Sequence, residues 1–195
     1  MSSKSWKGLQ QEYLLHRWWM KLRVDRVQLP NGTEIEEFHV VEYPDWVCVL
    51  CLTEGEQLVL VEQYRHGVGT LSLELPAGGI EPGEDPLQAA RRELLEETGY
   101  EAPVWESLGS FAPEPSKHTN LAHIFVARKA RQVGLPRLDP SEEMEVRLLT
   151  PVEALRLADE GKILHGIHAA ALFWAYFRGI LPNGHTGNGH VGSVR

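Results

Sequence analysis

The sequence predicts an α+β domain in which helices cover both faces of a mixed β-sheet. Strand-like segments fill the first half of the chain, a well-capped helix interrupts them, and two helical segments follow the last strand. The length of 195 residues fits one domain with an additional arm. A composition of 43% hydrophobic and 24% charged residues is ordinary for a globular protein, so a disordered or fibrous chain is excluded.

The N-terminal part of the chain predicts a β-hairpin arm. Segments 22–27 and 34–42 are strand-like, and the Asn31-Gly32 dipeptide between them is typical of a tight hairpin turn. Such a hairpin has few residues for a core of its own, so we expect it to lie against another surface. A second copy of the chain is the leading candidate, which predicts a homodimer formed through the arm.

Three further strands are predicted at 46–52, 58–64 and 71–75. The chain has two cysteines, Cys48 and Cys51, and both lie in the first of these strands. Their C-x-x-C spacing also occurs in redox and zinc sites. Side chains alternate between the faces of a strand, however, so residues three positions apart point to opposite sides. We therefore expect two separate core thiols in a reduced, intracellular protein.

A helix is predicted to begin after Asp85 and to end at Gly99. Asp85 is a good N-cap, Pro86 suits the first helical position, and apolar residues recur at helical spacing as far as Gly99. Beyond it the pattern predicts strands at 104–111, 121–128 and 144–150, and then helices at 151–160 and 166–178. The predicted parts of the chain are the arm (1–42), the main domain (43–180) and a flexible tail (181–195).

The charge balance restricts the partners of the protein. Acidic residues outnumber basic residues by 27 to 19, giving a formal net charge of -8, which argues against nucleic-acid binding. The longest apolar run, 169–177, is far shorter than the roughly 18–20 residues that cross a bilayer. The N-terminus lacks the apolar core of a secretion signal. We therefore expect no membrane partner and a cytoplasmic location.

The predicted helix at 86–98 carries clustered carboxylates. Glu93, Glu96 and Glu97 occupy positions i, i+3 and i+4, so they project from one side of the helix. They repel one another, and the helix dipole disfavours anions near a C-terminus. A solvated acidic face, with Arg92 paired to Glu96, is the alternative interpretation.

Two neighbouring features favour a metal site over a solvated face. The Gly-rich segment Ala77-Gly78-Gly79 leaves backbone accessible to a ligand, and Glu84 could add a fourth carboxylate. Oxygen ligands at this density suit Mg²⁺ or Mn²⁺, and Mg²⁺ commonly shares the oxygens of a phosphate substrate. A nucleotide or another phosphate compound is therefore the expected ligand.

Segment 78–100 resembles the Nudix box, the signature of the Nudix hydrolases. The one departure is Tyr100, which stands where an aliphatic residue is usual. The resemblance implies an α/β/α sandwich that hydrolyses a nucleoside diphosphate linked to another moiety with the help of divalent ions. The matching positions are Gly78, Glu84, Arg92, Glu93, Leu94, Glu96, Glu97 and Gly99.

The same resemblance implies a role for each acidic residue. Glu93 and Glu97 would be the principal metal ligands and catalytic carboxylates, Glu96 would assist them, and Glu84 would bind or orient the metal. Arg92 would hold the glutamates by salt bridges, as structural support together with Gly78 and Gly99.

Features outside the box resemble the ADP-ribose pyrophosphatase branch of the family. In the approach to the box, Leu73-Glu-Leu-Pro-Ala-Gly78, the backbone carbonyl of Ala77 would bind metal. In Gln63-Tyr64-Arg65, Arg65 would pair with a diphosphate. Pro115, sixteen residues after Gly99, stands at a spacing associated with this branch.

Two further assignments carry open alternatives. The acidic segment 142–145 resembles a mobile loop that supplies the catalytic base, for which we select Glu143, with Glu142 and Glu145 as rivals. Trp18 and Trp19 would stack on the base of the substrate across a dimer interface. Alternatively, the two tryptophans anchor the arm to its partner.

The resemblance therefore implies a Mg²⁺-dependent pyrophosphohydrolase that converts ADP-ribose to AMP and ribose 5-phosphate, or cleaves a related nucleoside diphosphate sugar. One alternative is a preference for another nucleotide sugar, such as GDP-mannose. Another is a non-catalytic, nucleotide-sensing module. Segments 113–120 and 43–46 depart from the pattern of the branch, which bears on the substrate more than on the hydrolase assignment.

Overall fold

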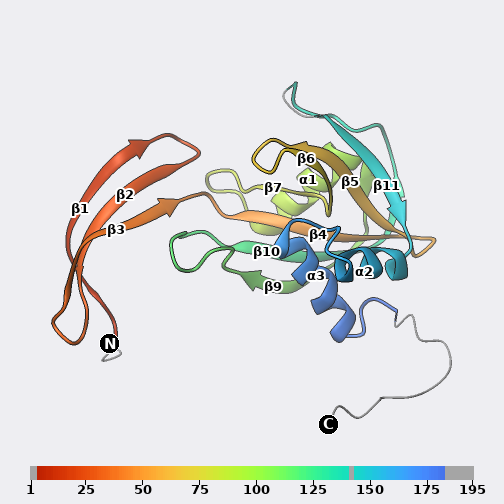
Figure 1. Ribbon diagram of the computed structural model, residues 1–195. Coiled ribbons are helices and arrows are strands. Elements are labelled where there is room, and N and C mark those ends of the chain that lie inside the picture. The colour runs from red at the N-terminus through yellow and green to blue at the C-terminus, as the bar shows by residue number, and fades with distance from the viewer. Residues whose placement is uncertain (1–3, 141–142, 183–195) are drawn as a thin grey trace, which may run out of the picture.

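A computed structural model describes residues 4–140 and 143–182 of the chain (Figure 1). Most of the predicted tail at 181–195, and Glu142 among the predicted loop residues, lie outside the described residues. The described chain forms a main domain and an arm that projects to one side of it. Within the described ranges, no helix is both long and apolar enough to cross a membrane.

The arm is an antiparallel sheet of β1 (Lys7–His16), β2 (Lys21–Gln28) and β3 (Glu34–Glu42), in that spatial order. The predicted hairpin is confirmed as β2 and β3, and Gly32 in its turn has a φ of 86°, which favours glycine. The sequence pattern does not predict β1. Nearly every residue of β1 is exposed, so the strand lacks the alternation between buried and exposed residues that identifies a half-buried strand.

The main sheet is mixed, as predicted. Its spatial order is β11-β5-β4-β10-β8, and β6, β7 and β9 pair with β5, β4 and β10 respectively. The β4 and β10 strands are parallel, whereas the other pairs are antiparallel. The strands are β4 (Trp46–Thr53), β5 (Leu58–Arg65), β6 (Thr70–Glu74), β7 (Ala77–Gly79), β8 (Tyr100–Glu101), β9 (Val104–Phe111), β10 (Ala122–Gln132) and β11 (Met144–Leu149).

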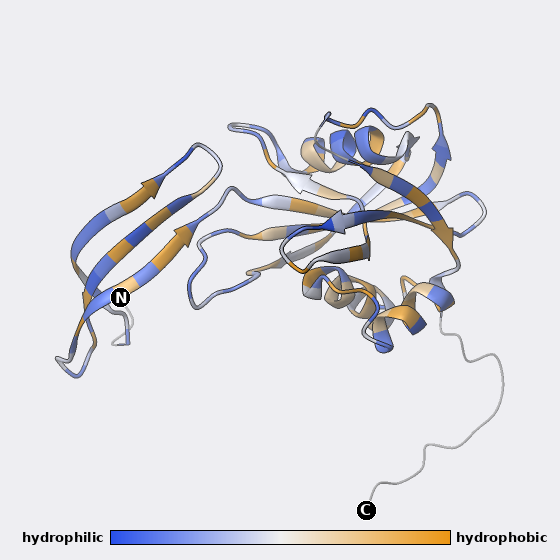
Figure 2. Cartoon of the chain, turned by 45° about the horizontal axis from the view of Figure 1, so that its top comes forward, coloured by the Kyte–Doolittle hydropathy of each residue, from blue (hydrophilic) through white to orange (hydrophobic). Residues whose placement is uncertain are grey.

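Helices cover both faces of this sheet, which confirms the predicted sandwich. The helix α1 (Pro86–Thr98) packs on one face, and α2 (Pro151–Asp159) and α3 (Gly166–Phe177) pack on the other. Hydrophobic residues dominate α3 (Figure 2). Cys48 belongs to the core beneath α2 and α3, and Cys51 belongs to the core beneath α1. Both thiols are buried and free, in agreement with the prediction that they lie on opposite faces.

Capping interactions bound the helices, and those of α1 are the ones predicted. The Asp85 side chain accepts the N–H groups of Leu87 and Gln88, and Gly99 ends α1 with a φ of 73°. Thr150 and Glu153 form a reciprocal capping box at the start of α2. These local interactions fix the length of α1 and therefore the position of its carboxylates.

The junction between arm and domain involves the loop that joins β9 to β10. The Val41 N–H donates to the carbonyl of Lys117 at 2.9 Å, and the Thr119 N–H donates to the carbonyl of Val41 at 3.2 Å. Tyr43 contacts His118 edge to face. The segments that depart from the branch pattern, 43–46 and 113–120, thus meet at this junction.

Candidate active site

The short strand β7 brings the Gly-rich segment against the acidic side of α1. It pairs with β4, so that Ala77 lies opposite Cys48 and Gly78 opposite Val47. The Ala77 N–H donates to Oε2 of Glu97 at 2.9 Å, and Glu97 is only 4% exposed. A buried carboxylate at the C-terminal end of a helix is unfavourable for stability by itself. The Glu97 position therefore indicates a role beyond the stability of the fold.

Gly78 leaves room for the carboxylate of Glu93. A Cβ atom built on Gly78 would lie 2.1 Å from Cδ of Glu93 and 2.2 and 2.3 Å from its two oxygens. Any larger residue at this position would displace that carboxylate. Gly78 thus acts as a cradle for Glu93, which gives a physical reason for the predicted support role.

Arg92 connects three of the four carboxylates. Its Nη1 donates to Glu93 at 2.7 Å and to Glu96 at 3.1 Å, while Nε and Nη2 donate to the two oxygens of Glu84 at 3.0 and 2.9 Å. Its Nη2 also donates to the carbonyl of Gly79 at 2.9 Å. The pairing with Glu96 expected for a plain acidic face is present, but it is one part of a larger network.

The network favours the charged forms of Glu84 and Arg92. Hydrogen bonds from Arg92 keep the pKa of Glu84 below its usual range. Conversely, the bonds to Glu84, and then those to Glu93 and Glu96, raise the pKa of Arg92 above its already high ordinary value. Arg92 and Glu84 therefore form a charged pair at neutral pH.

The donor chemistry of the site fits a hard divalent cation. Carboxylate oxygens and a backbone carbonyl at Ala77 are the ligand types that Mg²⁺ prefers. Among the described residues, no three acidic, His or Cys side chains converge into a group that could hold a metal ion as they stand. Glu84, Glu93 and Glu96 instead each pair with the guanidinium of Arg92.

A cavity of about 520 Å³ adjoins the buried end of this cluster. It brings together residues from β5, β7, α1 and the start of β11 with the residue before it. The residues that line it are Gln63, Tyr64, Arg65, Ala77, Gly78, Glu97, Glu143 and Met144. Five of these, Arg65, Ala77, Gly78, Glu97 and Glu143, are residues that the sequence analysis had selected.

Comparison with known proteins identifies the group to which the chain belongs. The family described as the NUDIX domain matches residues 42–169. The chain is a Nudix hydrolase. The Nudix match begins where the arm ends, and the arm itself matches the nucleoside diphosphate sugar hydrolase N-terminal domain over residues 6–41.

Individual proteins are similar to the chain over most of its length. The chain is 40% identical over 145 residues to the methanol dehydrogenase activator of Bacillus methanolicus, covering 74% of this chain and 78% of that protein. It is 32% identical over 173 residues to the ADP-ribose pyrophosphatase of Bacillus subtilis (strain 168), covering 88% and 93% respectively. A crystal structure of an ADP compounds hydrolase superposes with a TM-score of 0.79 at 21% identity, covering 92% and 97%, which shows the shared fold.

Of the two loop glutamates that the structure describes, Glu143 lines the cavity described above and Glu145 does not. Glu145 instead pairs with Arg147 at 2.9 Å and is largely exposed. Glu142 lies outside the described residues. This placement favours Glu143 over Glu145 as the candidate base.

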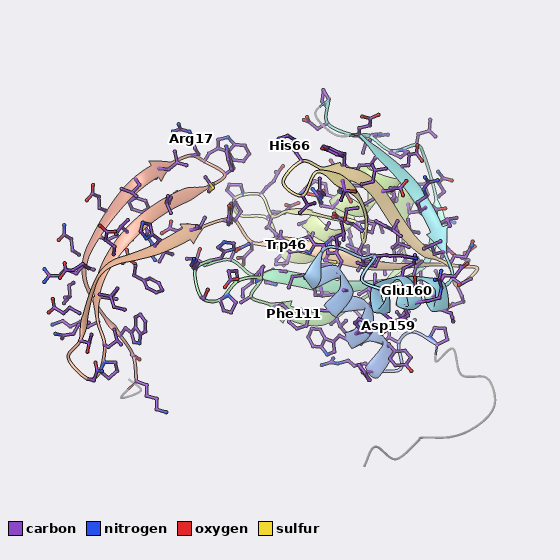
Figure 3. All side chains as sticks on the ribbon, viewed as in Figure 1. Arg17, Trp46, His66, Phe111, Asp159 and Glu160 are labelled. Atoms are coloured by element: carbon purple, nitrogen blue, oxygen red, sulfur yellow. The ribbon has the colours of Figure 1, made fainter. Side chains whose placement is uncertain are left out.

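Three predicted substrate-binding residues do not reach this cavity within one chain. Trp18 and Trp19 lie in the turn between β1 and β2, next to Arg17, at the end of the arm nearer the main domain (Figure 3). Trp18 is 89% exposed and Trp19 is also exposed. Pro115 lies exposed in the turn between β9 and β10. Sequence reasoning had grouped these three with Arg65, which does line the cavity.

The structure adds residues that the sequence analysis missed. Arg65 donates from Nε and Nη2 to the two oxygens of Glu74 at 2.8 and 2.6 Å, and Glu74 is buried. Behind Glu74 lies His168, which is buried in α3. One sequence signal pointed to Glu74, since a glutamate between two leucines in a strand of the core requires a partner.

Proposed function

We propose that this Nudix hydrolase cleaves the diphosphate of ADP-ribose or of a related nucleoside diphosphate sugar. ADP-ribose would yield AMP and ribose 5-phosphate. The observation that carries the proposal is the single cavity that Arg65 shares with Glu97 and Glu143. A diphosphate needs a cation to orient it, and its hydrolysis needs carboxylates for metal and proton chemistry. The ADP-ribose pyrophosphatase of Bacillus subtilis, similar along most of its length, supports this substrate class.

In this proposal Glu93 and Glu97 are the principal ligands of Mg²⁺, or of Mn²⁺ in its place. The other proposed metal ligands are Glu96, Glu84 and the backbone carbonyl of Ala77. Bound Mg²⁺ supplies charge neutralisation on the diphosphate and lowers the pKa of a bound water. The Ala77 N–H holds Glu97 in place, which supports its assignment as a ligand of fixed orientation.

The remaining groups orient the substrate and move a proton. The guanidinium of Arg65 pairs with a diphosphate oxygen. A carboxylate oxygen of Glu143 takes the proton as water attacks phosphorus, and the bond from that phosphorus to the bridging oxygen breaks. Arg92 keeps Glu84 and Glu93 from separating through their mutual repulsion, so its role is support.

A panel of nucleotide sugars tests the substrate assignment. With Mg²⁺ we expect ADP-ribose to be converted to AMP, the conversion to stop on addition of a chelator, and excess Mg²⁺ or Mn²⁺ to restore it. Product analysis by chromatography measures both the rate and the bond broken. Faster turnover of GDP-mannose would establish the alternative preference. Binding without turnover of any panel member would establish the nucleotide-sensing alternative.

We also propose that the arm forms a homodimer. Figure 1 shows the arm sheet projecting without a helix on either face. Figure 2 shows hydrophobic and hydrophilic residues alternating along its strands. Exposed apolar residues at this density favour association with another surface. The large exposed apolar residues of the arm are Trp6, Leu9, Tyr13, Leu14, Trp18 and Trp19.

The dimer has a direct test in solution. Light scattering is expected to give twice the 22.0 kDa mass of the chain. The Leu14→Glu variant should shift the protein toward the monomer, because it places a charge on the proposed apolar interface. Leu135→Glu is a matched control at an exposed leucine outside the arm and should leave the mass unchanged. A monomeric wild-type protein at micromolar concentration would rule the proposed homodimer out.

A further inference from the structure

We propose that Glu74 is a positioning residue that holds the guanidinium of Arg65 at the wall of the active-site cavity. This inference rests on the proposed function, because it concerns how the same cavity receives a diphosphate. Glu74 does not line that cavity, so it would act through Arg65 and not on the substrate itself.

The side chain of Glu74 is buried, whereas the side chain of Arg65 remains accessible. Glu74 lies at the end of β6 with its side chain 1% exposed, whereas the side chain of Arg65, at the end of β5, is 44% exposed. Two parallel hydrogen bonds of 2.8 and 2.6 Å join them. A bidentate pair of this kind sets the orientation of the guanidinium plane as well as its distance.

The charge balance around Glu74 makes this pairing specific. His168 and His165 are the other basic groups near Glu74, and Nδ1 of His168 lies 3.7 Å from the carboxylate. Burial lowers the pKa of His165 below its ordinary value. Burial, and then the charge of the neighbouring His165, lower the pKa of His168 to about 3, so its imidazole is neutral near pH 7. The Nδ1 atom of His168 accepts the Leu75 N–H at 3.3 Å. Arg65 is therefore the cation that compensates the buried carboxylate.

Electrostatics also opposes release of Arg65 from Glu74. Burial alone would raise the pKa of Glu74. The hydrogen bonds from Arg65, and after them the contributions of His168, of the Arg65 charge and of Ser72, outweigh burial, so the pKa of Glu74 lies below its ordinary value. A buried carboxylate that loses its partner is strongly destabilised. Rotation of Arg65 away from Glu74 is therefore unfavourable, and the guanidinium stays in place before substrate arrives.

Arg65 lies at the boundary of two cavities, where a guanidinium of fixed orientation can receive the diphosphate. Arg65 and Tyr64 line the 520 Å³ cavity and also a second cavity of about 460 Å³ beside it. The second cavity is lined further by His66, Gly67, Val68, Ser72, Glu74, Leu164 and His165. Figure 3 labels His66 in the turn between β5 and β6. A positive charge held at this boundary would meet the diphosphate without reorganisation, which lowers the cost of binding.

A double-mutant cycle tests the inference. The variants are Glu74→Gln, Arg65→Met and the double variant, each assayed for kcat and KM with the nucleotide sugar that the wild-type protein hydrolyses. We expect Glu74→Gln to raise KM about 10-fold, with kcat changed less than about 3-fold, as for coupled groups in contact. In the Arg65→Met background the same substitution should change KM by less than about 2-fold. A purely structural role would instead give equal effects in both backgrounds.

Two further variants make the cycle decisive. Glu160→Gln removes a carboxylate from the Arg156 pair on α2 and should keep the wild-type KM. Glu74→Asp keeps the charge but shortens the side chain, so we expect a KM between those of wild type and Glu74→Gln. If thermal denaturation shows that Glu74→Gln is unfolded, the KM of Glu74→Asp tests the inference in its place. A wild-type KM in folded Glu74→Gln or Glu74→Asp, or additive effects in the cycle, would overturn the inference.

Failure of the proposed function would give a different result from failure of the inference about Glu74. It would appear as absence of turnover by the wild-type protein with every nucleotide sugar of the panel. The inference about Glu74 would then be tested by comparing the affinities of wild type and Glu74→Gln for ADP-ribose, measured by calorimetry. Weaker binding by the variant would support the positioning role of Glu74, and equal binding would overturn it.

Discussion

Replacement of Glu97 by Gln is expected to abolish turnover while the fold remains intact. The Gln side chain keeps an oxygen that can accept the Ala77 N–H, so the contact between α1 and β7 survives. The substitution removes the negative charge that the proposed metal site requires. We expect kcat to fall at least ~100-fold, as for loss of a central electrostatic group in an active site. Product release with ADP-ribose and Mg²⁺ measures the effect.

The stability of the Glu97→Gln variant is a second readout. A carboxylate buried near the C-terminus of a helix, one turn from Glu93, is unfavourable for the folded state. The thermal midpoint should therefore stay the same or rise. Glu101→Gln, at an exposed carboxylate just after α1, is the matched control and should keep wild-type turnover. Turnover by Glu97→Gln within a few-fold of wild type would remove Glu97 from the proposed metal site.

The Gly78→Ala variant is expected to lose activity with little loss of stability. The new methyl group would overlap the carboxylate of Glu93, with its Cβ 2.1 Å from Cδ. Since the overlapping atoms are the end of a flexible side chain, Glu93 can rotate away at a cost of about 0.5–1.5 kcal/mol. Displacement of a reacting or ligand group by about 1 Å can cost ~100-fold in rate. Steady-state kinetics and thermal denaturation separate these two effects.

A neighbouring glycine supplies the control for Gly78→Ala. A Cβ on Gly79 would meet no atom within 4 Å, although Gly79 lies in the same strand. Gly79→Ala should therefore retain most of the wild-type activity. Equal activities in the two variants would show that the position of Glu93 against Gly78 does not matter for turnover.

Much of the architecture was predictable because it depends on local interactions. Asp85 and Gly99 bound α1 through hydrogen bonds and backbone conformation within a few residues of the helix. The 3.6-residue period then places Glu93 and Glu97 on one side of the helix. By contrast, β1 has no alternation of burial, because the arm sheet is exposed on nearly all of that strand. The hydrophobic pattern of the sequence therefore does not indicate that β1 pairs with β2.

The candidate site likewise contains residues that the sequence predicts and a pairing that it does not. Spacing and resemblance selected Glu84, Arg92, Glu93, Glu96 and Glu97, and the structure joins three of these carboxylates through Arg92. Neither spacing nor resemblance indicated that Arg65 would pair with Glu74. That pairing depends on how β5 and β6 align and on the burial of Glu74 beside α3.

The sequence by itself determined most of the helices and longer strands, the caps of α1 and the row of carboxylates along it, since each depends on residues close together in the chain. Only the tertiary structure decided which residues share the cavity with Glu97. It placed Arg65 and Glu143 there, left Trp18 and Trp19 exposed on the arm, and buried Glu74 behind Arg65. Burial and long-range packing set the free energy of a charge, and neither is encoded in the spacing of residues along the chain.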